Sequence, residues 1–431
     1  MTHPATLMLQ VWVGALMVFM ILPFELTNRE FYTFGFYMLI GLLLMFCVGV
    51  LIITGQGKSF VKQSEEYLGF GRADFIMKLV CLCSLLFFLI DIIQTGNYSL
   101  ATAYENRSDQ AQALLHGDTS NSSLWFKLAY LTYPASCVYA VRELVFSGKI
   151  RWKYVFIFGI LPGLLAAIAM GGRSPLFNVI AYGFLAYRFR RNLVGVSDSK
   201  FREQLTRIRP FSRALIVIFV ASSFIYFVNV FIERALTAGG VEIMFDVADD
   251  LWGVTFSGPV FELAVNIFGI GVIFILFAFS WYLVQGVIMS NSLFESYDGP
   301  VMLGTYGIDI VSTIMRRIDP VGVADQFNYL LSLDTYGFFP SAFGTLWVDY
   351  SYGSLLVVFI WGCLAGLVYK RVLQGYDTRW RIFAPFVVMG IVFSLVNTPI
   401  GYSNGFITYI WLVFVFMTIR RRKNHEARTT S

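Results

Sequence analysis

Residues 171–175, Gly-Gly-Arg-Ser-Pro, place a single arginine between two apolar runs. The glycines permit a tight turn, and Pro175 suits the first position of a following helix. Free N–H groups at a helix start attract anions, and the Arg173 guanidinium can bind a phosphate through two hydrogen bonds. This order of residues therefore indicates a phosphate site. The alternative is an arginine that marks a membrane interface, with its stem in lipid and its charge in water.

Asp349 is a second residue that could take part in chemistry, because it stands at the entrance of a long apolar run beside Tyr350 and Tyr352. A carboxylate at such a depth is costly unless it is paired or hydrated, so it is a functional candidate. The alternative is an acidic residue at a helix start, where the helix dipole favours it.

Residues 233–344 are rich in aromatic residues, glycines and carboxylates, which is the composition of a sugar-binding surface. Aromatic faces suit pyranose rings, and carboxylates suit sugar hydroxyls. The alternative is an ordinary folded cap on the rest of the protein. The aromatic residues singled out for sugar binding in and beside this block are Tyr282, Tyr297, Tyr306 and Tyr352.

Other kinds of catalytic site find little support. The three histidines, His3, His116 and His425, have no metal-ligand spacing, and no phosphate-binding loop of the P-loop type occurs. An ATPase, a zinc hydrolase and a Ser-His-Asp enzyme are therefore not favoured, and we predict neither a metal nor a cofactor. Acid–base chemistry must rest on Asp, Glu or Tyr.

The elements that position these residues must lie in a membrane. The 431 residues are 57% hydrophobic and only 14% charged, whereas soluble domains carry about 25% charged residues. Many apolar runs reach the length needed to cross a bilayer, and unbroken runs of this kind select helices rather than a barrel. We therefore predict an all-α polytopic membrane protein in which residues 1–431 form a single integral membrane domain.

About ten transmembrane helices are expected, with eleven or twelve as alternatives. The apolar run 262–284 is long enough to span, but both of its flanks are acidic. It is therefore predicted to be a re-entrant or interfacial helix, or a span whose partner is not visible. The ten expected spans are residues 7–24, 32–54, 76–95, 125–141, 154–170, 175–188, 214–232, 345–369, 382–398 and 404–419.

The basic residues orient these spans, because short cytoplasmic loops carry an excess of Lys and Arg. Basic clusters follow every second span, with the largest in residues 188–213, so both termini are expected in the cytoplasm. Two long periplasmic segments result, residues 96–124 and a large loop region, 233–344, that caps the bundle. Of the 32 basic residues, those left for the periplasmic side are Arg29, Arg107, Lys127, Arg173, Arg234, Arg316 and Arg317.

Three segments together resemble a known family. The Gly-Gly-Arg-Ser-Pro-Leu turn at 171–176 resembles the arginine-bearing turn of the bacterial oligosaccharide repeat unit polymerases, the Wzy-type O-antigen or capsule polymerases. Residues 343–366, which begin Phe-Gly and contain Asp349 beside an aromatic residue, are similar to a second pattern of that family. The aromatic-led stretch 281–295, before a large outer loop, also resembles it.

The resemblance implies a metal-independent glycosyltransferase of the bacterial inner membrane with a periplasmic active site. Such enzymes transfer a growing glycan from one undecaprenyl diphosphate carrier to a new lipid-linked repeat unit, which builds O-antigen, capsule or exopolysaccharide. The implied partners are the undecaprenyl-diphosphate-linked donor and acceptor, together with a chain-length regulator and a flippase. Binding of nucleic acid is not expected.

The resemblance assigns Arg173 to the diphosphate and Asp349 to the active site. Cationic side chains would stabilise the charge that develops on the leaving diphosphate, so Arg234, Arg316 and Arg317 join Arg173 as candidate ligands. The acceptor hydroxyl needs a base, for which the candidates are Asp349, Asp298 and Asp309.

Three other functions remain open. An O-antigen ligase uses the same kind of donor, but ligases of that family use an outer-loop histidine, which residues 233–344 lack. A lipid-linked oligosaccharide flippase or another transporter predicts inverted repeats and ionisable residues along a central path, and the sequence shows neither. A non-catalytic assembly or chain-length protein usually has fewer spans.

Overall fold

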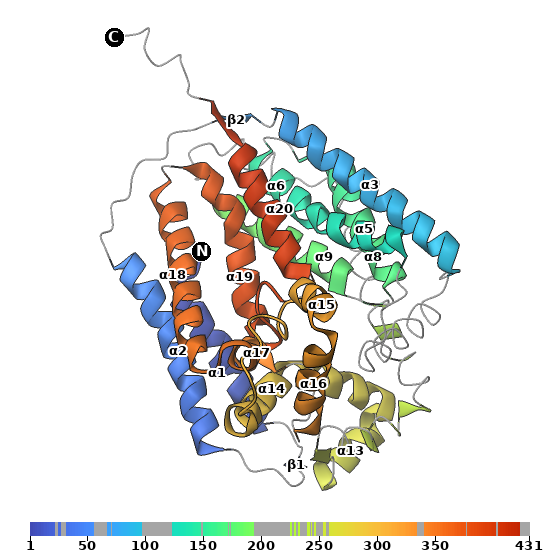
Figure 1. Ribbon diagram of the computed structural model, residues 1–431, viewed down its shortest axis with the longest axis vertical. Coiled ribbons are helices and arrows are strands. Elements are labelled where there is room, and N and C mark those ends of the chain that lie inside the picture. The colour runs from blue at the N-terminus through green and yellow to red at the C-terminus, as the bar shows by residue number, and fades with distance from the viewer. Residues whose placement is uncertain are drawn as a thin grey trace. The chain divides into compact units, whose positions relative to one another are not determined.

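A computed structural model gives the fold, which is drawn in Figure 1. Most of the predicted span 214–232 and most of the segment 96–124 lie outside the residues that the structure describes. The described residues are 1–21, 25–26, 32–55, 67–69, 71–96, 123–147, 150–170, 172, 174–193, scattered positions from 225 to 246, 253–255, 258–333, 340–375, 377–401 and 404–422.

Helices make up most of the described chain. The first helices are α1 (Pro4–Ile21), α2 (Thr33–Thr54), α3 (Gly71–Thr95), α5 (Leu124–Thr132), α6 (Pro134–Phe146), α7 (Trp152–Val155), the π-helix η1 (Phe156–Ile160), α8 (Leu161–Ala169) and α9 (Ser174–Leu193). They are followed by α13 (Pro259–Phe268), α14 (Ile270–Ser296), α15 (Asp309–Ile318), α16 (Pro320–Ser332), α17 (Ser341–Tyr350), the 3-10 helix η2 (Ser351–Gly353) and α18 (Ser354–Gln374). The last are the 3-10 helix η3 (Thr378–Phe383), α19 (Ala384–Val392), the 3-10 helix η4 (Phe393–Leu395) and α20 (Gly405–Thr418).

Seven helical segments in the described residues are long and apolar enough to cross a membrane. The protein is therefore a polytopic all-α membrane protein, as its composition predicts. Two of the other expected spans take different forms: 125–141 is divided between α5 and α6 at Pro134, and 404–419 becomes the 14-residue helix α20. The seven segments are Pro4–Ile21, Thr33–Thr54, Ala73–Thr95, Trp152–Ala169, Ile270–Ser296, Ser341–Gln374 and Thr378–Leu395.

Contacts between residues divide the chain into two compact units. The larger comprises Met1–Ile21, Glu30–Tyr187 and Tyr282–Ser431, and the smaller comprises Leu22–Arg29 and Arg188–Trp281. In the smaller unit, strand β1 (Glu25–Leu26) pairs antiparallel with β3 (Val254–Thr255). The candidate site described below lies entirely in the larger unit.

The apolar run 262–284 is not one helix. Gly269, with a φ of +79°, separates α13 from α14. Residues other than glycine rarely adopt that backbone conformation. The longer helix, α14, continues to Ser296 and is one of the seven apolar segments. Beside it, the Phe245 ring stacks on Phe277 and meets Phe274 edge-on.

Helices α2 and α18 lie side by side and run in the same direction (Figure 1). A Cβ atom on Gly49 would lie 2.3 Å from the Phe359 carbonyl oxygen, and one on Gly362 would lie 2.2 Å from the Phe46 carbonyl oxygen. Only glycine permits backbones to approach this closely. Gly362 and Gly366 form a small-xxx-small pair, the pattern that favours tight helix packing in membranes.

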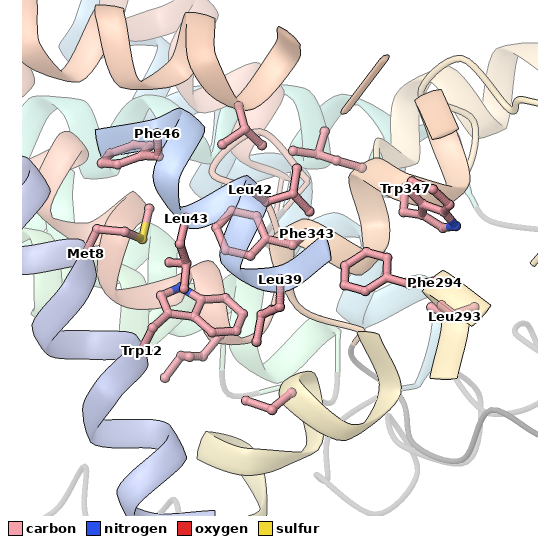
Figure 2. Packing of buried hydrophobic residues seen from close by; sticks show 14 of the residues in the cluster. Met8, Trp12, Leu39, Leu42, Leu43, Phe46, Leu293, Phe294, Phe343 and Trp347 are labelled. Atoms are coloured by element: carbon pink, nitrogen blue, oxygen red, sulfur yellow. The ribbon is translucent and has the colours of Figure 1, made fainter. Parts of the chain in front are cut away.

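The core of the larger unit forms around Trp12 of α1 (Figure 2). Its ring stacks on Phe343 with 4.7 Å between centroids, and its indole N–H donates a 2.9 Å hydrogen bond to Ser394 Oγ. Trp12 is fully buried, so this bond satisfies a donor that has no access to water. The contact joins α1, α17 and η4.

One end of the larger unit, which we call the His3 end, gathers the basic segments. His3 Nε2 lies 3.3 Å from Thr54 Oγ1, and Lys370 Nζ donates to the Ile53 carbonyl oxygen at 3.1 Å. Strand β2 (Tyr67–Gly69) pairs with β4 (Arg420–Arg422), so the segment after α2 meets the segment after α20. Basic segments that were assigned to one side of the membrane thus share one end of the bundle.

Ion pairs hold α3 against α6 and α6 against the start of α7, and two of the residues in them, Arg142 and Glu143, are buried. Arg142, which is 1% exposed, pairs with Asp74 of α3, and Lys78 pairs with the same carboxylate. Glu143, which is fully buried, pairs with Arg151 at 2.8 Å. Removing one partner of such a pair is costly because the other charge then stays buried alone.

Candidate functional site

The opposite end of the larger unit, which we call the Asp349 end, holds most of the predicted site residues. Helix α17 reaches it from a buried start, where Ser341 Oγ lies 2.6 Å from Ser290 Oγ of α14 and accepts from Phe343 N at 3.1 Å. These hydroxyls bond to polar groups at a helix start that water does not reach. The helix then delivers Asp349 near its last residue.

Asp349 accepts hydrogen bonds from a loop more than forty residues earlier in the chain. Tyr306 N donates to Oδ1 at 3.0 Å and Gly307 N donates to Oδ2 at 2.9 Å, while Leu303 N donates to the Asp349 carbonyl oxygen at 2.9 Å. The aspartate is 2% exposed. Its carboxylate therefore fixes the loop 297–308, which joins α14 to α15.

Glycines bring a third segment against this loop. A Cβ on Gly307 would lie 2.6 Å from Asp349 Oδ2, and a Cβ on Gly401 would lie 2.1 Å from the Gly307 carbonyl oxygen. Gly401 belongs to the turn between η4 and α20, where its N–H donates to Thr398 Oγ1 at 2.9 Å. The loop 297–308 is thus held between α17 and this turn.

Tyr130 of α5 links the same turn to the start of α15. Its hydroxyl donates to Asp309 Oδ2 at 3.0 Å, and its carbonyl oxygen accepts from Asn404 Nδ2 at 2.5 Å. Asp309 is the first residue of α15 and is exposed. Neither Tyr130 nor Asn404 was predicted as a site residue, because each lies within or beside an apolar run.

Asp298 lies at the beginning of the loop and is also exposed. The Tyr329 hydroxyl of α16 donates to Asp298 Oδ1, and this hydrogen bond is the main reason that the pKa of Tyr329 is raised. Tyr297, beside Asp298, donates to the Pro300 carbonyl oxygen at 2.5 Å, and burial raises its pKa to about 12. Both tyrosines therefore keep their protons at neutral pH.

The two described arginines of the predicted diphosphate set lie on α15. Arg316 is half-buried with its guanidinium 4.6 Å from the centre of the Phe327 ring, and burial lowers its pKa. Arg317 is exposed. The other two members, Arg173 and Arg234, lie outside the described residues. Of the turn that contains Arg173, Gly172 is described, and its backbone N–H donates to the Ala167 carbonyl oxygen at 3.0 Å.

The predicted sugar-binding tyrosines differ in their accessibility. Tyr352 is 63% exposed and rests edge-on against Trp347, with 5.0 Å between ring centroids. Tyr306 is half-buried, and burial followed by the Asp349 charge raises its pKa. Tyr282 is half-buried on α14. Tyr352 is therefore the most exposed of the four predicted tyrosines.

Together these residues place two exposed carboxylates, several protonated tyrosines and an exposed arginine at one end of the unit. Carboxylates can accept a proton and arginines can bind phosphate. Within the described residues, no group of three His, Cys, Asp or Glu side chains could hold a metal ion. The arrangement can therefore accept a proton and bind an anion.

Comparisons with known proteins add no relative. A scan of protein-family models found no match, and no curated protein or solved structure was found to be similar to the chain.

Proposed function

We propose that the chain is a glycosyltransferase of the bacterial inner membrane that polymerises undecaprenyl-diphosphate-linked oligosaccharide repeat units. The observation that carries this proposal is the gathering of carboxylates, tyrosines and arginines at the Asp349 end, while the basic loops gather at the His3 end. Basic loops favour the cytoplasm. The Asp349 end would then face the periplasm, where polymers such as O-antigen or capsule are extended.

The proposed topology has both termini in the cytoplasm and about ten crossings. If α14 crosses the membrane as well, the number of crossings becomes odd. An even number therefore requires either that α14 return to its own side or that the residues outside the described ranges contain one more span. Asn291 near the end of α14 bonds to the Tyr32 backbone, and Gly286 meets the Leu395 carbonyl oxygen in the core. These contacts suit a helix whose C-terminal part runs from the core to the Asp349 end.

The reaction forms one glycosidic bond and breaks another. A hydroxyl of the acceptor repeat unit attacks the anomeric carbon of the donor glycan, and the bond from that carbon to the diphosphate oxygen breaks. Undecaprenyl diphosphate leaves, and the hydroxyl proton passes to a carboxylate. We assign that carboxylate to Asp309 or Asp298, because both are exposed, and we assign Asp349 to positioning the loop between them.

The leaving diphosphate carries several negative charges, so cations that face it in the transition state would accelerate the reaction. Arg317 is exposed and two turns from Asp309 on α15, which supports its role as a ligand. Arg316 is half-buried, and we place it as a support for the same helix rather than a direct ligand. Arg173 and Arg234 complete the proposed set on sequence grounds.

Three outcomes of one assay distinguish this proposal from the alternatives. The purified protein is reconstituted in proteoliposomes with a lipid-linked repeat unit, and a lipid A core acceptor is added in a parallel sample. Polymer ladders support the repeat unit polymerase. Transfer to the lipid A core would indicate an O-antigen ligase, and leaflet exchange without elongation would indicate a flippase, so either result alone contradicts the proposal.

A further inference from the structure

Helix α15 separates its apolar and polar residues more completely than the membrane spans do. At 100° per residue, the polar residues fall on one side of the helix and the apolar residues on the other. The polar set is Asp309, Ser312, Thr313, Arg316 and Arg317, and the apolar set is Ile310, Val311, Ile314, Met315 and Ile318. A helix of this pattern normally buries its apolar face.

The structure does not bury that face against the protein. Ile314 is 51% exposed, Ile318 is 70% exposed, and none of the α15 residues is buried. Val321, just beyond the end of the helix, is 70% exposed as well. Arg316, on the polar side, lies over the Phe327 ring, and Ile310, Val311 and Met315 on the apolar side are half-buried. Ile314 and Ile318 therefore face away from the rest of the described protein.

Contacts at its first residue attach the start of α15 to the bundle. Asp309 is bonded to Tyr130 of α5, and the preceding loop is fixed by Asp349. The neighbour of Tyr130 on α5, Leu131, is 40% exposed, and Leu124 at the start of that helix is 66% exposed. Exposed leucines on a helix of a membrane bundle face lipid. We expect the exposed residues of α15 to begin beside a surface that faces lipid.

Charge identifies which part of the lipid α15 would meet. Arg317 lies next to Ile310 and Ile314 on the helix circumference, at the boundary between the two faces. Interfacial helices combine an apolar face in the acyl boundary with basic residues at the level of the phosphates. An exposed arginine at such a boundary can extend to a phosphate while its stem stays on apolar surface.

We propose that α15 is an interfacial helix that lies in the membrane leaflet at the Asp349 end. Its face formed by Ile314 and Ile318 is immersed at the boundary of the acyl chains, and Arg317 lies at the level of the phosphates. Thr313, also exposed, faces water. The helix start, with Asp309, is thereby held at the level of the lipid headgroups. This placement does not depend on the enzymatic proposal.

Spin labels at single cysteines test the placement in the full-length protein. The five native cysteines are replaced, and Ile314→Cys, Ile318→Cys and the matched control Thr313→Cys are labelled in phospholipid nanodiscs. Collision with oxygen reports lipid exposure, and collision with a water-soluble nickel chelate reports water exposure. We expect the ratio of oxygen to nickel collisions to be several-fold higher at 314 and 318 than at 313.

Two results would overturn the proposal. Equal nickel access at all three positions would place the apolar face in water. Protection of 314 and 318 from both reagents, together with dipolar broadening between labels, would mean that a second copy of the chain covers this face. Because Ile314, Ile318 and Thr313 are all partly or largely exposed, the cysteine variants remove no buried contact. A lack of glycan elongation by the same protein would leave the lipid result unchanged.

Discussion

At the scale of single residues, Asp349 orders structure through hydrogen bonds that a sequence does not reveal. Its two carboxylate oxygens accept from Tyr306 N and Gly307 N, and the residue is buried. A carboxylate that is occupied in this way is suited to holding a loop, whereas the exposed Asp309 and Asp298 are suited to accepting a proton. The sequence alone makes the three aspartates equal candidates for the base, whereas their positions in the fold suit them to different roles.

Replacing Asp349 should lower stability as well as activity. Asp349→Asn puts an amide NH₂ where one backbone N–H needs an acceptor, and a lost hydrogen bond to a charged group costs about 1.5–3 kcal/mol. Thermal unfolding in detergent should therefore begin at a clearly lower temperature than for Asp325→Asn, which alters an exposed carboxylate of α16. An unchanged melting temperature with lost elongation would instead give Asp349 a direct catalytic role.

A second prediction, on diphosphate binding by Arg173, rests on the sequence. If its guanidinium binds the donor diphosphate, Arg173→Ala should reduce elongation by about 100-fold, and Arg173→Lys should recover only part of it because lysine lacks the two-pronged geometry. Arg107→Ala, in the segment 96–124, serves as the control. Polymer length and yield are measured in cells at matched expression. Full-length polymer in normal yield from Arg173→Ala would refute the diphosphate role.

At the scale of elements, glycines determine how closely the helices pack. The contact of α2 with α18 brings a Cβ placed on Gly362 to 2.2 Å from the Phe46 carbonyl oxygen, whereas a Cβ on Gly41 would meet only Leu355 Cδ2 at 3.8 Å. Both glycines belong to the same helix pair, but only Gly362 is crowded by backbone. Packing rather than helix propensity explains its presence.

The two alanine substitutions should therefore have opposite consequences. Gly362→Ala forces the helices apart and should destabilise the protein by about 1–3 kcal/mol. Gly41→Ala should be neutral or slightly stabilising, since alanine favours helix more than glycine does. Melting temperatures of the two purified variants in the same detergent provide the comparison. Equal effects would mean that α2 and α18 are not in close contact.

The sequence predicts most helices because lipid-spanning segments must be long and apolar. The expected spans 32–54 and 154–170 nearly coincide with α2 and with the segment from α7 to α8. The start of α17 at Ser341 was missed, because its buried hydroxyl partner, Ser290, is supplied by another helix. The partners of Asp349 were also missed, because backbone N–H groups of a distant loop leave no signal in side-chain types.

At the scale of the whole molecule, the distribution of charge implies the orientation in the membrane. Basic segments collect at the His3 end, and the exposed carboxylates Asp298 and Asp309 lie at the Asp349 end. A protein inserted according to the positive-inside rule would present the Asp349 end to the periplasm.

Cysteine accessibility in intact cells tests this orientation. With the five native cysteines replaced, Pro300→Cys should react with a membrane-impermeant maleimide added outside the inner membrane. Arg371→Cys, near the end of α18, should react only after the membrane is permeabilised. Both positions are exposed in the fold, so a failure to react reports the side rather than burial. The reverse pattern would invert the topology and remove the periplasmic site.

The central claim is that glycan elongation takes place at the Asp349 end. Its most direct test compares polymer ladders made in proteoliposomes from one lipid-linked repeat unit by the wild-type protein and by Asp309→Asn, Asp298→Asn and the control Asp325→Asn. We expect ladders from the wild type and the control, and loss of elongation by about 100-fold or more, the usual range for removing a catalytic base, in Asp309→Asn or Asp298→Asn. Ladders of normal length from both of these variants, or none from the folded wild-type protein, would contradict the claim.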